Sequence, residues 1–310
     1  MLRYISLRLM QGLVTAFVLL TMVFVFARVS GNPIDLVVSP DADLAERAAA
    51  AKRLGLDQPM IVQYLKFVGG LFHGDFGTSI RFDRPVTELF IQTIPATLRL
   101  TGLALLFALV IGIPLGVLSA TRRGKPADYA ARAVSALSLA APEFWVGMML
   151  ILVVALKFGL LPISGMNGPS SYVLPAFTLS LPVIAGISRI LRSSLVESLD
   201  SEYIKLARIK GVSQRSIVWK HGLRNALLPV VTFLSINLIH LVSGSVTVET
   251  VFAWPGVGRM MYNGVSQQDY PLEQGLLLIL GLNVILVNLL VDVLYTYIDP
   301  RIRLRPERGR

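Results

Sequence analysis

The sequence predicts an all-α membrane protein, with about six helices that cross the bilayer. Of its 310 residues, 54% are hydrophobic and 15% are charged, and the mean hydropathy is +0.66. Soluble domains ordinarily carry about 25% charged residues, so this chain is too apolar to be one. Apolar runs of about 20 residues, enough to cross a bilayer as a helix, alternate with charged loops along the chain. A lipid bilayer is therefore its expected environment.

The first apolar run, Leu9 to Ala27, is uncharged and follows a short end that carries Arg3 and Arg8. A cleaved signal peptide is the alternative, but its apolar core spans only about 7 to 15 residues. We therefore expect residues 1–28 to hold a cytoplasmic N-terminal end and the first transmembrane helix.

Residues 29–96 form a mixed, polar segment that is too long for a turn. Alanine and charge over 44–54, and an amphipathic pattern over 60–71, predict two helices there. We expect this segment outside the cytoplasm. A structured collar on the helix bundle and a contact surface for a partner are compatible roles for it.

Five further apolar runs predict a core within residues 97–298, at 98–120, 133–158, 173–191, 230–248 and 275–298. In the run at 133–158, Pro142 is followed by Glu143. An acid at membrane depth is costly and marks a functional candidate, so Glu143 is a candidate for a gate or a subunit contact. The alternative is a hydrated position near the interface. Asp292, near the cytoplasmic end of the last run, is expected to face a partner subunit.

The run at 230–248 carries a polar stripe. At about 100° per residue, five polar residues fall within an arc of roughly 140°: Thr232, Ser235, His240, Ser243 and Thr247. Lipid would tolerate such a stripe poorly. A water-lined translocation path explains it, and so does hydrogen bonding between helices. For His240, hydrogen-bonded packing is favoured over a proton relay.

Charge distribution predicts the topology. The N-terminus, the loops at 121–132 and 192–228 and the tail at 299–310 are rich in Lys and Arg, whereas residues 29–96 and 249–273 are net acidic. The positive-inside rule then places both termini and the 192–228 loop in the cytoplasm. The formal charge of +10 follows this alternation, so nucleic acid is not an expected partner.

The cytoplasmic stretch Asp200 to Pro229 is basic and amphipathic. Its first half predicts a short helix capped at Asp200 or Ser201, with Glu202 in the first turn and cations near the end, as the helix dipole favours. Gly211 should stop this helix, and a second can run from Ser213 toward His221. Two short helices across the mouth of a bundle would form a projecting docking element for a soluble partner.

Sequence motifs for catalysis are missing. There is no P-loop motif, because the fragment Gly124-Lys125 is followed by proline and lacks the upstream glycine. Neither G-x-S-x-G nor H-E-x-x-H occurs. The chain has no cysteine, and its three histidines are far apart, so neither a metal site nor a cofactor is expected. An active pump built on this chain must take its energy from a separate ATPase.

Several motifs resemble one family. The runs E-Y-I-x-x-A-R-x-K-G at 202–211 and K-H-G-L-R-N-A-L-L-P at 220–229 resemble the cytoplasmic loop of bacterial ABC-importer permeases of the dipeptide, oligopeptide, glutathione and nickel branch. Other similar motifs are L-G-L-D-Q-P at 54–59, G-D-F-G at 74–77, P-A-T-L at 95–98, I-G-I-P-L-G at 111–116, W-P-G-V-G-R at 254–259, D-Y-P at 269–271 and D-P-R-I-R at 299–303. The chain departs from the family at Lys205, where the generic loop has Glu, and at Gln268, where the peptide branch usually has Arg.

The resemblance implies the first permease subunit of a type I ABC importer in a bacterial inner membrane, which moves dipeptides or oligopeptides. The residues implied to couple it to the ATPase are Glu202, Tyr203, Ala207, Arg208, Lys210 and Gly211. Trp254 is implied to lie near an outer gate. The implied partners are a second homologous permease, one or two ATPase subunits and an extracytoplasmic solute-binding protein.

Two alternatives stay open. Glutathione or nickel could be the cargo of the same architecture. A self-sufficient secondary carrier or channel is a different class, but such a protein would not need the 192–228 loop and would be expected to hold more buried ionisable groups or an internal repeat.

Overall fold

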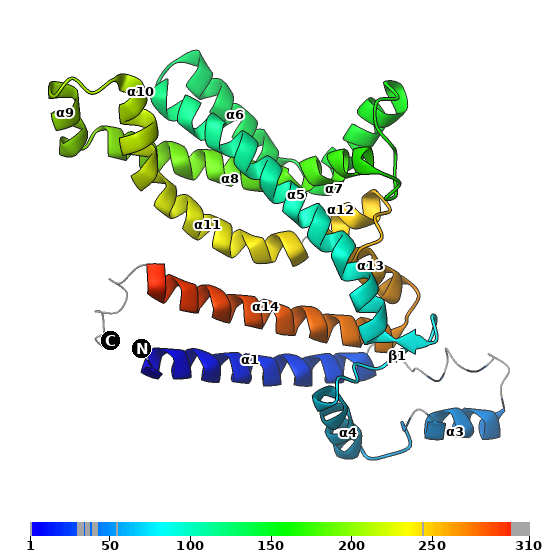
Figure 1. Cartoon of the computed structure of the whole chain (residues 1–310). Coiled ribbons are helices and arrows are strands. Elements are labelled where there is room, and N and C mark those ends of the chain that lie inside the picture. Colours follow the sequence, from blue (N-terminus) through cyan, green and yellow to red (C-terminus); the bar gives the residue numbers. More distant parts are fainter. Residues whose placement is uncertain are drawn as a thin grey trace. The chain divides into compact units, whose positions relative to one another are not determined.

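The computed structural model describes residues 2–29, 34, 38, 43–53, 55–243 and 245–298. These residues are mostly helical, with a short two-stranded hairpin (Figure 1). They form two compact units, one of Met1–Thr93 with Met260–Arg310 and one of Ile94–Arg259. The helices α5 (Val86–Thr121) and α13 (Val257–Ser266) contribute residues to both units.

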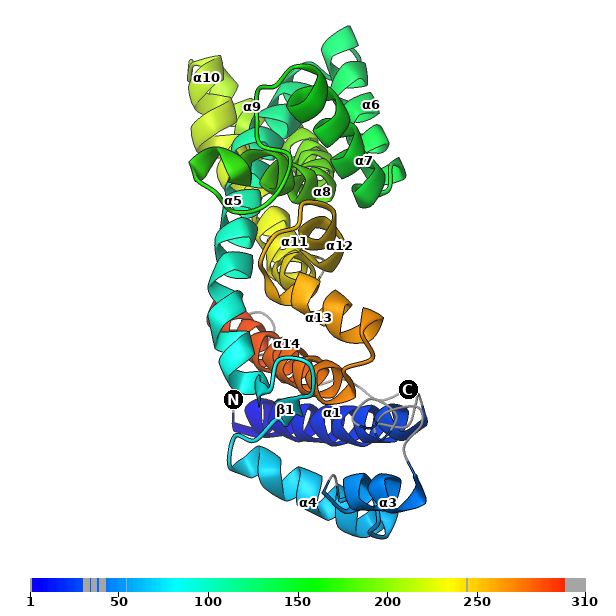
Figure 2. The ribbon, with the colours of Figure 1, turned by 90° about the vertical axis from the view of Figure 1, so that its right-hand side faces the viewer.

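The first unit is built on a long helix pair. Its remaining elements are α1 (Leu2–Val29), α3 (Leu44–Arg53), α4 (Met60–Phe72), β1 (Thr78–Ser79), β2 (Arg84–Pro85) and α14 (Tyr270–Ile298). Figures 1 and 2 both show α1 and α14 side by side. A Cβ atom on Gly281 would lie 2.3 Å from Leu19 Cδ2, so glycine permits this close approach. The predicted helices at 44–54 and 60–71 are confirmed as α3 and α4.

A buried carboxylate ties the hairpin to the start of α14. Asp269 of the D-Y-P motif is 2% exposed. It accepts hydrogen bonds from the hydroxyl of Ser79 and from the backbone N–H groups of Ile80 (3.2 Å) and Arg81 (3.0 Å). This carboxylate therefore fixes the turn between β1 and β2.

Replacing Asp269 with asparagine is expected to open the hairpin, because the amide loses one acceptor and the charge that strengthens these bonds. A loss of about 2 kcal/mol raises the open fraction roughly 30-fold. The rate of trypsin cleavage after Arg81, which is exposed, measures this open fraction. The control is Asp83→Asn in the same turn, which is exposed and has a positive φ of 50° that asparagine tolerates. Equal cleavage rates in both variants would contradict the assignment.

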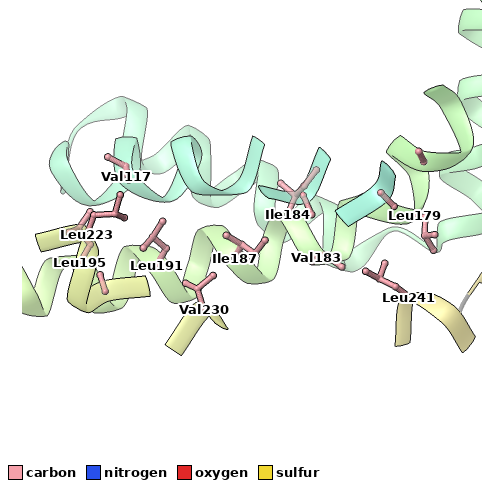
Figure 3. Packing of buried hydrophobic residues seen from close by; sticks show 14 of the residues in the cluster. Val117, Leu179, Val183, Ile184, Ile187, Leu191, Leu195, Leu223, Val230 and Leu241 are labelled. Carbon is pink, nitrogen blue, oxygen red and sulfur yellow. The ribbon is translucent and has the colours of Figure 1, made fainter. Parts of the chain in front are cut away.

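The second unit is organised around α8 (Val173–Leu199). Its other elements are α6 (Pro126–Ala140), α7 (Glu143–Leu150), η1 (Ile151–Lys157), η2 (Pro169–Tyr172), α9 (Glu202–Ile209), α10 (Gln214–Ser216), η3 (Ile217–Gly222), α11 (Leu223–Ser243) and α12 (Ser245–Val251). Along α8, Ile187, Leu191 and Leu195 have no exposed surface, and Figure 3 shows them in one cluster with Val230 of α11. The core of this unit therefore lies between α8 and the helices packed on it.

Most predicted spans are found. Four described helices are long and apolar enough to cross a membrane: Ser6–Phe26, Val86–Thr121, Pro169–Leu199 and Tyr270–Leu289. They match the predicted spans at 9–27, 98–120, 173–191 and 275–298, although α5 begins earlier, at Val86. The span predicted at 230–248 coincides largely with α11 and α12, and part of it lies outside the described residues.

The span predicted at 133–158 is broken near its proline. The helices α6 and α7 with η1 are bent by 106° at the break between them. Ala141 is extended, with φ −82° and ψ 128°, because a following proline disfavours helical dihedrals. Pro142 itself has no N–H to continue the helix.

Residues 249–273, between the last two predicted spans, hold the end of α12, all of α13 and the start of α14. Glycines in such a stretch usually indicate turns. Gly258 instead allows close packing, since a Cβ atom on it would lie 2.6 Å from Val246 Cα.

Candidate functional site

The predicted cytoplasmic loop forms a short helix, α9, which follows directly on α8. Ser201 occupies the N-cap position, with extended dihedrals of φ −74° and ψ 156°. Its side chain does not cap α9 as predicted, because the hydroxyl donates backwards to the carbonyl of Ser198. The helix is therefore tied to the end of α8 from its first turn.

One face of α9 is anchored in the core. Ile204 has no exposed surface and belongs to the same cluster as Leu199 and Ile217. The hydroxyl of Tyr203 lies 2.6 Å from Ser198 Oγ and accepts a hydrogen bond from Asn225 Nδ2 at 2.9 Å. Apolar and polar contacts thus hold α9 against both α8 and α11.

The opposite face of α9 is open. Leu206 is 58% exposed and Ile209 is 82% exposed. The surrounding side chains are also exposed, and they are Glu202, Lys205, Arg208 and Lys210. Glu202 pairs with Lys205 at 2.7 Å. Figure 1 shows α9 and α10 together at one end of the second unit, beyond the ends of α8 and α11.

Gly211 ends α9 as predicted. It has φ +76°, and its N–H donates to Arg208 O at 3.0 Å while Val212 N–H donates to Ala207 O at 3.1 Å. This bond pair is the Schellman arrangement, in which glycine takes the left-handed position without penalty. The predicted second helix is found from Gln214 onward, but it does not end near His221, since η3 continues into α11.

A second cluster lies at the turn between α5 and α6. The Asp128 carboxylate is 1% exposed and receives Arg192 Nε at 2.7 Å and Arg192 Nη2 at 2.8 Å. Ser119 Oγ donates to it at 2.6 Å, and Gly124 N–H donates at 3.0 Å. The hydrogen bonds from Arg192 hold the pKa of this carboxyl well below its usual range. Sequence reasoning missed this site, because its only signal was a single acid in an otherwise basic loop.

A third cluster joins two of the sequence motifs around a buried acid. Glu249 has no exposed surface. Thr97 Oγ1 of the P-A-T-L motif donates to Glu249 Oε1 at 2.7 Å, and Arg259 N–H of the W-P-G-V-G-R motif donates to Oε2 at 3.0 Å. The sequence did not single out Glu249, although this acid connects the two motifs.

Trp254 packs inside the same cluster. It is fully buried, and its Nε1 donates to Ala96 O at 3.0 Å. Tyr172 meets the indole edge-on, with ring centroids 4.6 Å apart. The side chain of Trp254 thus contacts residues of its own unit, and its predicted role at a gate or subunit contact stays a prediction.

The predicted path residues lie along α11 and α12. The hydroxyl of Thr232 donates to Leu228 O at 3.3 Å, and that of Ser235 donates to Val231 O at 3.0 Å. Thr247 is exposed. The side chains of His240 and Ser243 lie outside the described residues, so the stripe stays a prediction.

Two further predicted residues are placed as follows. Glu143 begins α7 and is half-buried, whereas the side chain of Asp292 lies outside the described residues, as does the tail at 299–310. Among the side chains that the structure describes, no three His, Cys, Asp or Glu residues are grouped as metal ligands would be.

Comparisons with known proteins place the chain in one family. The family model described as "Binding-protein-dependent transport system inner membrane component" matches residues 112–304, and the model of the N-terminal part of such membrane components matches residues 1–101. The chain is 39% identical to the oligopeptide transport system permease protein AppB of Bacillus subtilis, over 88% of this chain and 90% of that protein. It is 38% identical to the glutathione transport system permease protein GsiC of Escherichia coli K12, over 98% of this chain and 99% of that one.

Solved structures show the same fold. A chain of the MetNI methionine ABC transporter, in inward-facing conformations, aligns with a TM-score of 0.57 and 23% identity, over 68% of this chain and 96% of that chain. A chain of an amino acid ABC transporter aligns with a TM-score of 0.55 and 19% identity, over 68% and 94% of the two chains. The protein therefore belongs to the binding-protein-dependent transport system inner membrane components, and it is a permease subunit of an ABC importer with the type I fold.

Proposed function

We propose that this permease moves small peptides across the cytoplasmic membrane of a bacterium, driven by an ATPase subunit that docks on α9. The observation that carries the docking is the two-sided character of this helix. Ile204 is fixed in the core, whereas Leu206 and Ile209 are 58% and 82% exposed. Exposed apolar side chains grouped on a projecting element mark a surface for a partner.

The docking surface consists of Leu206, Ile209 and the neighbouring cations Arg208 and Lys210. Apolar side chains would enter a groove of the ATPase, and the cations would pair with acids at its rim. Tyr203 and Gly211 act behind this surface, because they hold α9 in place, and Glu202 and Ala207 complete the helix.

The remaining parts of the assembly follow from the family. A second homologous permease completes the pathway, one or two ATPase subunits bind on the cytoplasmic side, and a solute-binding protein delivers cargo from outside. Both termini lie in the cytoplasm, because Lys and Arg concentrate in the loops on that side. ATP binding then biases the bundle between two states.

Peptide is the proposed cargo because the similar permeases belong to transport systems for oligopeptides or for glutathione. AppB, at 39% identity, is an oligopeptide permease, and GsiC, at 38%, is a glutathione permease. Glutathione is itself a small peptide, so peptide bonds and free carboxylates are the shared chemistry. Thr232, Ser235, His240, Ser243 and Thr247 are the proposed polar lining of the path. Glutathione and nickel are the alternative cargoes.

Docking is tested by Ile209→Glu. A buried charge at the centre of a docking surface is costly, so we expect co-purification of the ATPase subunits to fall at least about tenfold. Leu44→Glu is the matched control, because Leu44 is 87% exposed on a different helix. Equal recovery of ATPase with both variants would rule out this docking surface.

Cargo is tested with the complete transporter in proteoliposomes. ATP-dependent uptake of a dipeptide, an oligopeptide, glutathione and Ni²⁺ is compared with the binding protein present. We expect peptide uptake that requires ATP and every subunit. Uphill uptake by this chain alone would identify a secondary carrier instead.

A further inference from the structure

The buried carboxylate of Asp128 is coordinated on both of its oxygens. One oxygen is engaged by Ser119 Oγ and Arg192 Nε, and the other by Gly124 N–H and Arg192 Nη2. Arg132 Nε approaches within 3.5 Å as well. The two bonds to Arg192 are parallel, and this bidentate geometry fixes orientation as well as distance.

The pair joins segments that are distant in sequence. Asp128 stands in the first turn of α6, whereas Arg192 lies in α8, 64 residues further along the chain. Next to this pair, α5 and α8 touch closely. A Cβ atom on Gly116 of α5 would lie 2.9 Å from the Cβ atom of Leu191 of α8. Close-packed helices have little freedom to slide, so α5, α6 and α8 are held together at this end.

This end of α8 is also the end that carries the docking helix. Arg192 lies within the last turns of α8, and Ser201 and α9 follow directly. A second contact joins the same segments, because Arg123 Nη1 lies 3.2 Å from Asp200 Oδ2. Both of these side chains are largely exposed, so this outer pair contributes little by itself. The pair of the buried Asp128 and the half-buried Arg192 is therefore the directional link between the α5–α6 turn and α8.

We propose that Asp128 and Arg192 are positioning residues for energy coupling, which make the α5–α6 turn and α8 move as one lever when α9 is displaced. This inference rests on the proposed docking of an ATPase on α9. A buried ion pair is a poor source of stability compared with apolar packing, but its geometry specifies one arrangement of the segments that it joins. Without the pair, packing still holds α8 against α5, but no directional contact fixes the α5–α6 turn to α8. The turn then no longer follows α8 when α9 is displaced.

The first test uses the neutral pair Asp128→Asn with Arg192→Gln in the complete transporter. The asparagine oxygen can still accept from Gly124 N–H, while its NH2 group can donate to the Ser119 hydroxyl, and no charge is left buried alone. We expect ATP hydrolysis to stay near the wild-type rate, while the amount of peptide moved per ATP falls about tenfold. An unchanged amount of peptide per ATP would overturn the proposal, because a structural role alone would not lower this ratio.

The control is Arg122→Gln, which neutralises an exposed cation in the same α5–α6 turn. We expect its ratio of peptide to ATP to match that of the wild type. The wild-type transporter must first show ATP-dependent peptide uptake, and its failure to do so would count against the proposed function rather than against the lever.

The second test leaves Asp128 and Arg192 intact. Because the chain has no cysteine, the variant Arg123→Cys with Asp200→Cys carries only these two thiols in this chain. A short bifunctional thiol reagent, with a cleavable disulfide in its spacer, then joins them. If the turn and α8 move as one lever, the cross-linked transporter should take up peptide as fast as the same variant before cross-linking. Loss of uptake that a reducing agent restores would show relative motion and would overturn the proposal.

Discussion

Peptide uptake is expected to stop in a Gly211→Pro variant, although the chain should still insert and assemble. Proline fixes φ near −65° and has no N–H, whereas Gly211 has φ +76° and donates to Arg208 O at 3.0 Å. The Schellman end of α9 cannot form with proline. The docking surface would lose its orientation while the buried helices stay unaffected.

Uptake and membrane insertion are measured on the same vesicles. Gly55→Pro is the matched control, because Gly55 also has a positive φ, of 67°, and a Cβ atom on it would meet nothing within 4 Å. Gly55 lies far along the chain from α9. Gly211→Ala should reduce uptake less than Gly211→Pro. Alanine at a positive φ costs about 1 kcal/mol of backbone strain, and a Cβ atom at this position would meet nothing within 4 Å. Wild-type uptake by Gly211→Pro would contradict a coupling role for α9.

Replacing Gly258 with alanine is expected to destabilise the second unit by about 3 kcal/mol, since overpacked sites cost that much when the neighbour cannot move. The new methyl group would lie 2.6 Å from Val246 Cα and 2.8 Å from Val246 N. These are backbone atoms of α12, so no side-chain rotation relieves the clash. Separation of α12 from α13 would also weaken the bonds that hold Glu249.

Thermal denaturation of the purified complex measures this loss. Gly102→Ala is the control, because a Cβ atom on Gly102 would meet nothing within 4 Å, and alanine favours a helix over glycine. The control should therefore be as stable as the wild type or slightly more stable. Equal melting temperatures for the two variants would show that α12 and α13 are not packed as described.

Local signals made most of the helices predictable. Long apolar runs predicted α1, α5, α8 and α14, because burial in lipid requires them. The composition of residues 200–211 predicted α9, and Gly211 predicted its end, because glycine takes a positive φ without penalty.

Prolines were not interpretable from the sequence alone. Pro95, Pro114 and Pro182 are accommodated inside long helices, whereas Pro142 separates α6 from α7 with a sharp bend. Proline thus lies inside a helix at some positions and separates two helices at another. Packing of the surrounding helices decides between them, and the chain does not encode that packing locally.

The buried acids could not be predicted as sites because their partners are remote in sequence. Asp128 meets Arg192 across 64 residues, and Glu249 meets Thr97 across 152. In the sequence, Asp128 is a lone acid in a basic loop, and Glu249 is an acid before a Trp-Pro-Gly motif. Neither pattern indicates which hydrogen-bond donors contact the acid. The polar stripe, by contrast, is predicted from periodicity alone, and it stays a prediction.

The contacts around Glu249 also bear on the order in which the protein is made. Ala96 and Thr97 leave the ribosome about 150 residues before the groups that they bind, Trp254 and Glu249. At a synthesis rate of about 5 to 20 residues per second, this interval lasts from several seconds to half a minute. During that time Ala96 and Thr97 are present in the nascent chain without the residues that they bind in the folded protein.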